Sequence, residues 1–205
     1  MVEPVRERIL AEATRLFGAQ GFAATSIQAI ADAVGITKPT LVYHFGSKDG
    51  LREAVLDAVM GHWRNEVPRL MAAAAAGGPR LDALLTAFFD FFRRDPGRSR
   101  LLLREILDRP QELALRLRRD LQPYTGLLTH AIEVGQGQGL LRSDVDPAAY
   151  TVLVISSALG VVAVGEHTAA LVAPEPDVDA LQHELLRVAR TALLSPRPPD
   201  RPPEP

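Results

Sequence analysis

Lysines, threonines and aromatic residues lie close together in the segment TKPTLVYHFGSKDG, residues 37–50. Of the 23 lysine and arginine residues in the chain, only Lys38 and Lys48 are lysines, and both lie in this segment, on either side of Tyr43 and His44. Ammonium groups, hydroxyls and an imidazole can hydrogen-bond phosphate oxygens and base edges. These residue types therefore indicate a contact with nucleic acid, provided that one element holds them on the same surface.

A short helix is predicted just before this segment. Ile30 and Val34 repeat at a helical interval, and Gly35 is a typical helix-ending residue. We expect Thr25 to begin this helix through a capping box, in which its hydroxyl accepts from the backbone N–H of Gln28 and the Gln28 side chain reaches back.

The polar segment itself predicts a second short helix. Thr37 is placed to cap it, and Pro39 falls in its first turn, where a missing N–H costs nothing. Leu41 and Phe45 would face inward. With a first helix over about 9–17 packed behind them, the two short helices form a helix-turn-helix.

DNA contacts follow from this arrangement, because the second helix of such a unit enters the major groove and its first residues meet base edges. Lysine can donate to guanine, and threonine or proline can contact a thymine methyl group. Tyr43 and His44 suit phosphate or sugar contacts, and Lys48 would add a cation at the start of the next helix. Two alternatives stay open, a structural His44 and a solvated Lys48. The predicted DNA-contacting residues are Thr25, Thr37, Lys38, Pro39, Thr40, Tyr43, His44 and Lys48.

The remaining periodicity is also helical, so we predict an all-α fold. A long helix should run from Lys48 towards Ala76, kinked or divided at Pro68. The Pro-rich tail at 196–205 should be disordered. Further helices are expected over 81–92, 98–107, 111–134, 147–165 and 180–194, with a turn at 135–139.

Composition excludes several classes of site. The chain has no cysteine, so it has no thiol nucleophile or thiolate metal site. Its five histidines lie far apart, and it has neither a phosphate-binding loop nor a nucleophile elbow. We therefore expect no enzyme activity, no cofactor and no metal. The net charge of −2 gives no bulk attraction to DNA, so any contact depends on local charge.

One uncharged stretch, residues 147–165, is nearly long enough to cross a membrane. It contains Thr151, Ser156 and Ser157 and has no basic cluster at either end. We expect a core or interface helix and no membrane contact. No export signal is visible at the N-terminus, so a cytoplasmic location is expected.

The segment TSIQAIADAVGITKPTLVYHFGSKDGL, residues 25–51, resembles the DNA-binding signature of TetR-family transcriptional regulators, approximately IAxxAGVSxGTLYxHFxSKxxL. The chain departs from it at Val42, where the family usually has a tyrosine that contacts the DNA backbone. A second segment, EVGQGQGLLRSDVDPAAYTVLV, is similar to the turn that many members carry before their last two helices. The directly matching residues are Ile30, Ala31, Gly35, Thr40, Leu41, His44, Phe45, Ser47, Lys48 and Leu51.

The resemblance implies a DNA-binding domain at 1–46 and a helical ligand-binding and dimerisation domain at 47–195. It implies a homodimer on double-stranded DNA with a pseudo-palindromic operator, released when a small-molecule inducer shifts the long fourth helix. A regulator that needs no ligand, or an activator, remains the alternative.

The residues of these sites are expected as follows. The ligand cavity would be lined by Trp63, Phe88, Phe89, Phe92 and Tyr124, with Arg104, His130 or His167 as polar anchors. The dimer interface would contain Leu153, Ser157, Gly160, Val164, Leu181, Leu185 and Val188.

Overall fold

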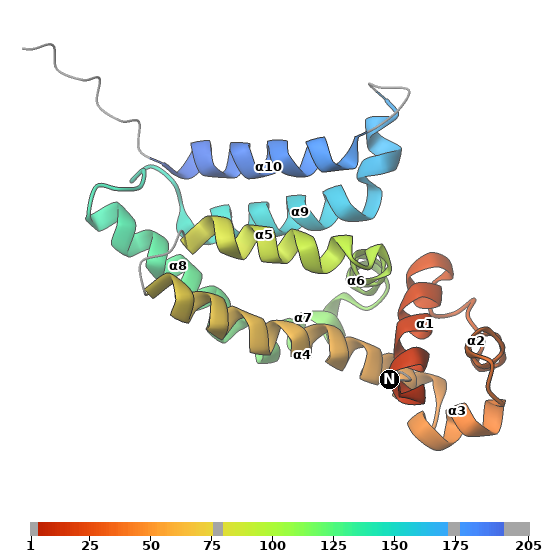
Figure 1. The fold of residues 1–205 in the computed structure, drawn as a ribbon. Coiled ribbons are helices and arrows are strands. Elements are labelled where there is room, and N and C mark those ends of the chain that lie inside the picture. Colours follow the sequence, from red (N-terminus) through yellow and green to blue (C-terminus); the bar gives the residue numbers. More distant parts are fainter. Residues whose placement is uncertain (1–3, 76–79, 172–176, 195–205) are drawn as a thin grey trace, which may run out of the picture.

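A computed structural model describes residues 4–75, 80–171 and 177–194, which form ten helices (Figure 1). The predicted all-α fold is confirmed; within these ranges the one β feature is an isolated bridge between Leu141 and Leu194. The predicted tail at 196–205 lies outside the described residues. In chain order the helices are α1 (Val5–Gln20), α2 (Ile27–Val34), α3 (Lys38–Phe45), α4 (Lys48–Ala75), α5 (Arg80–Arg93), α6 (Pro96–Asp108), α7 (Pro110–Asp120), α8 (Gln122–Gly137), α9 (Pro147–Ala169) and α10 (Val178–Leu193).

Helices α1, α2 and α3 gather at one end of the molecule, beside the start of α4 (Figure 1). Gly21 ends α1 with φ of 86°, and Gly35 ends α2 in the left-handed region with φ of 76°. Ile30 and Leu41 are fully buried, so their predicted inward orientation is correct. The three helices thus form the expected helix-turn-helix with α1 behind it.

The N-cap of α2 is Ser26, so the predicted capping box at Thr25 is wrong by one residue. Ser26 Oγ accepts from the backbone N–H of Ala29 at 3.0 Å. Thr25 is 1% exposed, and its hydroxyl donates to the carbonyl of Gly21 at 2.8 Å. Adjacent serine and threonine have equal capping chemistry, and only tertiary packing decides which one turns inward.

Helix boundaries in the C-terminal part differ from the prediction at the prolines. Helix α4 continues through Pro68 without division. The predicted helix at 111–134 is instead two helices that meet at Leu121, because Pro123 has no backbone N–H to continue the first one. Helix α8 then extends to Gly137, three residues into the predicted turn at 135–139.

Two facing glycines allow α1 to pack closely on α6. A Cβ atom added to Gly18 would lie 2.6 Å from the carbonyl oxygen of Gly97, so a side chain there would push the helices apart. Arg104 on α6 donates to the carbonyls of Gly18 and Ala19 at 2.9 and 3.0 Å. These carbonyls belong to the last turn of α1, where no further helical N–H can reach them. The contact fixes the helix-turn-helix unit to the rest of the protein.

The described hydrophobic core has two separate clusters. The larger cluster extends from Ile9 and Phe17 in the helix-turn-helix to Trp63 and Phe92 and ends at Leu159 on α9. The smaller cluster lies between α8, α9 and α10 and contains Ile132, Tyr150, Val154, Ala189 and Leu193. Helix α9 therefore contributes one end to each cluster.

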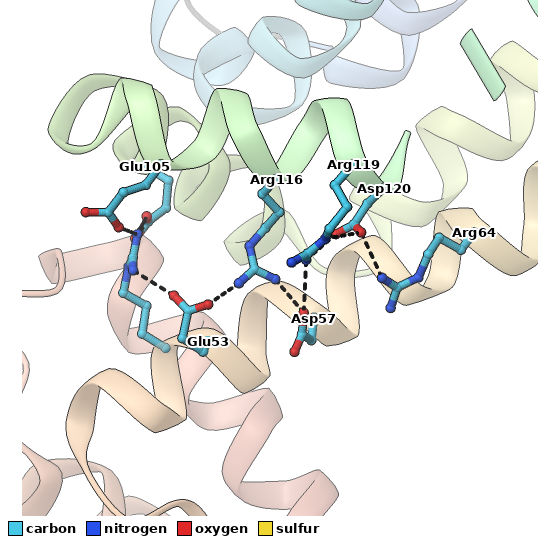
Figure 2. Close-up of polar contacts among 9 residues, drawn as sticks. Glu53, Asp57, Arg64, Glu105, Arg116, Arg119 and Asp120 are labelled. Atoms are coloured by element: carbon cyan, nitrogen blue, oxygen red, sulfur yellow. Dashed lines mark hydrogen bonds and ion pairs between the residues drawn. The ribbon is translucent and has the colours of Figure 1, made fainter. Parts of the chain in front are cut away.

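An ionic ladder joins α4 to α6 and α7 (Figure 2). Glu53 and Asp57 are four residues apart, so they lie on one face of α4, and Arg116 of α7 bonds both carboxylates. Further along, Arg64 Nη1 lies 3.1 Å from Asp120 Oδ1. The ladder consists of Arg52, Glu53, Asp57 and Arg64 on α4, Glu105 on α6, and Glu112, Arg116, Arg119 and Asp120 on α7.

Two positions of the ladder are buried. Arg52 is 5% exposed and Glu105 is 3% exposed, and Arg52 Nε lies 2.9 and 3.0 Å from the two carboxylate oxygens. The hydrogen bond to Glu105 raises the pKa of the Arg52 guanidinium. Asp120 is 4% exposed, and the hydrogen bond from Arg119 lowers the pKa of its carboxyl group. Both ends of the ladder therefore hold charge inside the protein, where each group depends on its partner.

We expect Glu105→Ala to lower the free energy of unfolding by about 3 kcal/mol, because the buried Arg52 guanidinium loses its main partner. Urea unfolding at neutral pH measures the change. Glu112→Ala is the matched control, since Glu112 also contacts Arg52, at 3.2 Å, but its side chain is 64% exposed. The control should cost much less, because exposed ion pairs contribute little. Equal losses for both variants would show that the Arg52–Glu105 contact is not the main support.

Candidate DNA-binding surface and ligand cavity

The first turn of α3 presents a polar surface to solvent. Thr37 caps the helix as predicted: its Oγ1 accepts from the backbone N–H of Thr40 at 3.3 Å, and the two hydroxyls lie 2.8 Å apart. Lys38 and Pro39 are exposed, and Pro39 falls in the first turn. Tyr43, one turn later, is 86% exposed. Four of the eight predicted contact residues thus lie at the cap and first turn of one short helix, and a fifth, Tyr43, follows one turn later.

His44 and Val42 lie beside this surface. The His44 side chain is exposed, and its ring centroid is 5.5 Å from that of Tyr43. Val42, at the position where a backbone-contacting tyrosine is usual, is half-buried. The exposed phenol nearest to that position is therefore the one of Tyr43, the following residue.

Lys48 has a role within the chain that its sequence did not indicate. Its Nζ donates to the carbonyl of Ala23 at 3.2 Å and lies 4.3 Å from the ring centroid of Phe22. The guanidinium of Arg109 lies 4.6 Å from the same ring. Lys48 thus ties the start of α4 to the turn after α1, and its side chain is half-buried.

The structure corrects one predicted DNA contact, that of the Thr25 side chain. Its buried hydroxyl donates to carbonyls inside the protein, so the side chain does not reach the surface. Ser26, the actual cap, is exposed in its place. Two arginines of α1 also lie close to the helix-turn-helix: Arg6 is 5.3 Å from the ring centroid of Phe45, and Arg8 donates to the carbonyl of Val34.

A cavity of about 790 Å³ lies between the two core clusters. This volume is within the usual range for small-molecule sites. Its wall includes residues from every helix from α4 to α10. The lining residues are Met60, Trp63, Val67, Phe92, Leu102, Ile106, Leu113, Leu117, Leu121, Tyr124, Thr125, Leu128, Ala131, Ile132, Val134, Gly135, Gln138, Leu140, Leu141, Tyr150, Thr151, Val154, Ile155, Ser156, Ala158, Leu159, Arg190, Leu193 and Leu194.

Three of the predicted aromatic residues, Trp63, Phe92 and Tyr124, line this cavity. Phe89 is buried, at 3% exposed, and is not in its wall. The side chain of Phe88 lies outside the described part of the structure.

The three predicted polar anchors are not in the cavity wall. Arg104 instead hydrogen-bonds the last carbonyls of α1, as described above. His130 is exposed, with its Nδ1 3.4 Å from a Glu133 oxygen, and His167 is exposed near the end of α9. Residue type suggested these anchors, whereas the orientation of each helix turns them away from the cavity.

The cavity wall is predominantly apolar, with a few polar groups that sequence reasoning missed. The Thr151 hydroxyl donates a hydrogen bond to the backbone carbonyl of Pro147 at 2.8 Å. The Tyr150 hydroxyl donates to the backbone carbonyl of Ala189, also at 2.8 Å. Gln138 and Arg190 are exposed wall residues close to the C-terminal ends of α8 and α10. Arg190 follows Ala189 directly, so the Tyr150 hydrogen bond locates this charge beside the first turn of α9.

Helices α9 and α10 expose an apolar face in the single chain. Leu153 is 66% exposed, and Val164 and Val188 are 44% and 47% exposed. A Cβ atom added to Gly160 would meet no atom within 4 Å, whereas one at Gly165 would lie 3.4 Å from Leu181 Cδ1. Gly165 is therefore the point where α9 and α10 pack closely, and Gly160 faces outward. Ser157 is exposed, and Leu181 and Leu185 are half-buried.

Helix α9 has the length and hydropathy of a membrane span. It nevertheless packs against α5, α6, α8 and α10, and Tyr150, Ala158 and Ala163 are buried within the protein. These contacts are those of a core helix.

Comparison with known proteins places the chain among bacterial regulators. The regulator YerO of Bacillus subtilis is 32% identical over 140 residues, which cover 67% of this chain and 48% of YerO. The transcriptional activator FasR of Mycolicibacterium smegmatis is 34% identical over 97 residues, 47% of this chain and 44% of FasR. The chain thus spans about half the length of these two relatives. The repressor NicS of Pseudomonas putida is 28% identical over 144 residues, covering 68% of this chain and 67% of NicS.

Solved structures share the fold. The ketosteroid transcriptional regulator KstR2 of Mycobacterium tuberculosis superposes with a TM-score of 0.74 at 17% identity, covering 96% of this chain and 98% of KstR2. A transcriptional regulator from Saccharomonospora viridis in complex with choline gives a TM-score of 0.68 at 19% identity, with 93% and 98% covered.

Two family models match the chain itself. The model described as "Bacterial regulatory proteins, tetR family" matches residues 9–55, which include all three helices of the DNA-binding unit except the first turn of α1. The model described as "Tetracyclin repressor-like, C-terminal domain" matches residues 79–191, which include the helices that surround most of the cavity. The chain therefore belongs to the TetR family, whose members are DNA-binding transcriptional regulators and not enzymes.

Proposed function

We propose that this regulator is a homodimeric repressor that leaves a pseudo-palindromic operator when a small molecule fills its cavity. The observation that carries the proposal is the position of α4. This helix begins at the DNA-binding unit, and further along its Met60, Trp63 and Val67 line the cavity. A change in the cavity wall can therefore act on the helix that positions α3.

The DNA side of the proposal rests on the exposed start of α3. Lys38 and Thr40 would meet base edges there, while Tyr43 and His44 would reach the sugar-phosphate backbone. Lys48 would contribute its charge to the backbone from a site where Ala23 and Phe22 already orient the ammonium group. A held cation loses less side-chain entropy on binding than a mobile one.

Two faces of α7 connect the cavity with α4 and could couple ligand binding to the position of α4. Leu113, Leu117 and Leu121 recur every four residues and line the cavity. On the adjoining face, Arg116 and Asp120 belong to the ionic ladder and hold Glu53, Asp57 and Arg64 of α4. A ligand that displaces α7 would thus also displace α4. Thermodynamics then requires that the ligand bind more tightly to the DNA-incompetent state, and DNA must weaken ligand binding by the same factor.

Names given to relatives support a ligand-responsive repressor. NicS is a repressor, and a structure of the related fold is a complex of SmeT with triclosan. FasR is an activator, which keeps activation as the second candidate. Both candidates require the same DNA-binding surface.

Selection from randomised duplex DNA with purified full-length protein, at near-physiological salt, tests the proposal. We expect enrichment of a two-fold symmetric site, because two copies of α3 related by a dimer axis read equivalent half-sites. Enrichment of an asymmetric site, or of no site, would contradict a dimeric operator-binding protein. Fusing the selected site to a reporter then distinguishes repression from activation.

Lys38 and Lys48 should differ in their effect on the selected site. We expect Lys48→Ala to weaken binding to all duplexes similarly and to reduce the salt slope by about one, as for one lost phosphate contact. Lys38→Ala should cost about 1–3 kcal/mol on the selected site and relax the base preference at one position of each half-site. Titrations at several salt concentrations, on specific and scrambled duplexes, measure both effects. A change of base preference in Lys48→Ala would reverse these roles, and thermal unfolding controls for its contact with Ala23.

Gly160→Leu tests the dimer interface. The single chain leaves space at Gly160, so folding should tolerate the side chain, whereas a subunit packed on the α9–α10 face would clash with it. We expect light scattering to show a shift from dimer to monomer. Gly126→Leu is the matched control, because Gly126 on α8 also has no atom within 4 Å of an added Cβ. A Gly160→Leu protein that remains dimeric would place the interface elsewhere.

A further inference from the structure

The cavity extends along α9. Its wall includes Thr151 near the start of this helix and Leu159 two turns later. Eight residues of α-helix rise about 12 Å, which is the length of α9 that borders the cavity. A volume of about 790 Å³ accommodates a molecule of that length.

The two ends of the cavity differ in chemistry. The Leu159 end belongs to the larger core cluster, where Trp63, Phe92 and Leu102 complete an apolar wall. At the other end, the hydrogen bond from Tyr150 to the carbonyl of Ala189 brings the last turn of α10 beside the first turn of α9. The Arg190 side chain lines the cavity on that side and is exposed.

Arg190 is also the one formally charged residue among the described residues of the cavity wall. The described wall contains no aspartate, glutamate, lysine or histidine. A cationic ligand would therefore lose its hydration without finding a counter-charge, which is strongly unfavourable. An anionic group at the Arg190 end would gain a charge-assisted hydrogen bond, and the planar guanidinium matches a carboxylate in geometry.

We propose that the cavity binds an elongated amphipathic anion, an aliphatic carboxylate whose chain lies against Trp63 and Leu159 and whose carboxylate lies at Arg190. This inference rests on the proposed ligand-binding function. An extended chain advances about 1.2 Å per bond, since a peptide residue of three bonds spans at most 3.6 Å. A length of about 12 Å therefore corresponds to roughly ten bonds, so decanoate is a suitable probe.

The test uses full-length protein loaded with the neutral dye N-phenyl-1-naphthylamine, which reports on apolar cavities by its fluorescence. Decanoate, decanol and decylamine share one chain and differ in the charge of the head group. We expect decanoate to displace the dye at the lowest concentration and decylamine at the highest. In Arg190→Gln the decanoate midpoint should rise about tenfold, as expected for a lost hydrogen bond to a charged group, while the decanol midpoint should stay unchanged.

Arg187→Gln is the matched control. Arg187 lies on the same helix and carries the same charge, but it is not in the cavity wall. Its replacement should leave all three midpoints unchanged, because it removes the same net charge without touching the head-group site.

The outcomes separate this inference from the proposed function. If decanol and decanoate displace the dye equally, or if Arg187→Gln and Arg190→Gln have the same effect, the cavity binds small molecules but the anion site is wrong. If the dye binds but no compound displaces it, the anion site is wrong. If the protein does not take up the dye at all, the ligand-binding function is contradicted as well. Decanoate that displaces the dye and also releases the selected operator would support both.

Discussion

The buried pair of Arg52 and Glu105 constrains the whole chain, because it fixes α4 against α6 a few residues after the DNA-binding unit ends. Two charges inside a protein are stable only together, so the pair admits few relative positions of the two helices. Helix α6 in turn holds α1, through Gly97 facing Gly18 and Arg104 on the last carbonyls of α1. Helix α6 therefore fixes the position of the DNA-binding helices relative to the cavity wall.

The middle rungs of the ladder have a different character from this buried pair. The Arg116 side chain is 10% exposed and is shared between Glu53 and Asp57, whose side chains are half exposed to solvent. A carboxylate in contact with water depends less on its partner than a buried one does. The middle of the ladder can therefore adjust more easily than its two ends, where Glu105 and Asp120 are buried.

Local signals in the sequence were sufficient for the helices of the DNA-binding unit, but not for the choice of Ser26 over Thr25 as the cap of α2. Gly21 and Gly35 end helices, and Thr37 caps α3, because each effect depends on neighbours within four residues. The ladder could not be predicted, since its partners are 53 to 63 residues apart and nothing local pairs them. The same holds for the cavity: aromatic type correctly suggested Trp63 and Phe92 for its wall, but the charged residue of the described wall, Arg190, resembles any surface arginine of an amphipathic helix. Residue type indicates which interactions a side chain can make, and only the packing of the helices determines which way the side chain points.

The division of the hydrophobic core into two clusters affects how the protein unfolds. Each cluster buries its own side chains. Because the cavity lies between them, the two clusters share few contacts and do not form one cooperative unit. Regions with fewer shared contacts open at lower free energy, so α8 and α10 can exchange their amide hydrogens without disturbing the helix-turn-helix. A bound molecule touching both clusters would supply the missing contacts. Such a molecule would act as a part of the interior that the chain itself does not encode, and its binding would be a final step of folding.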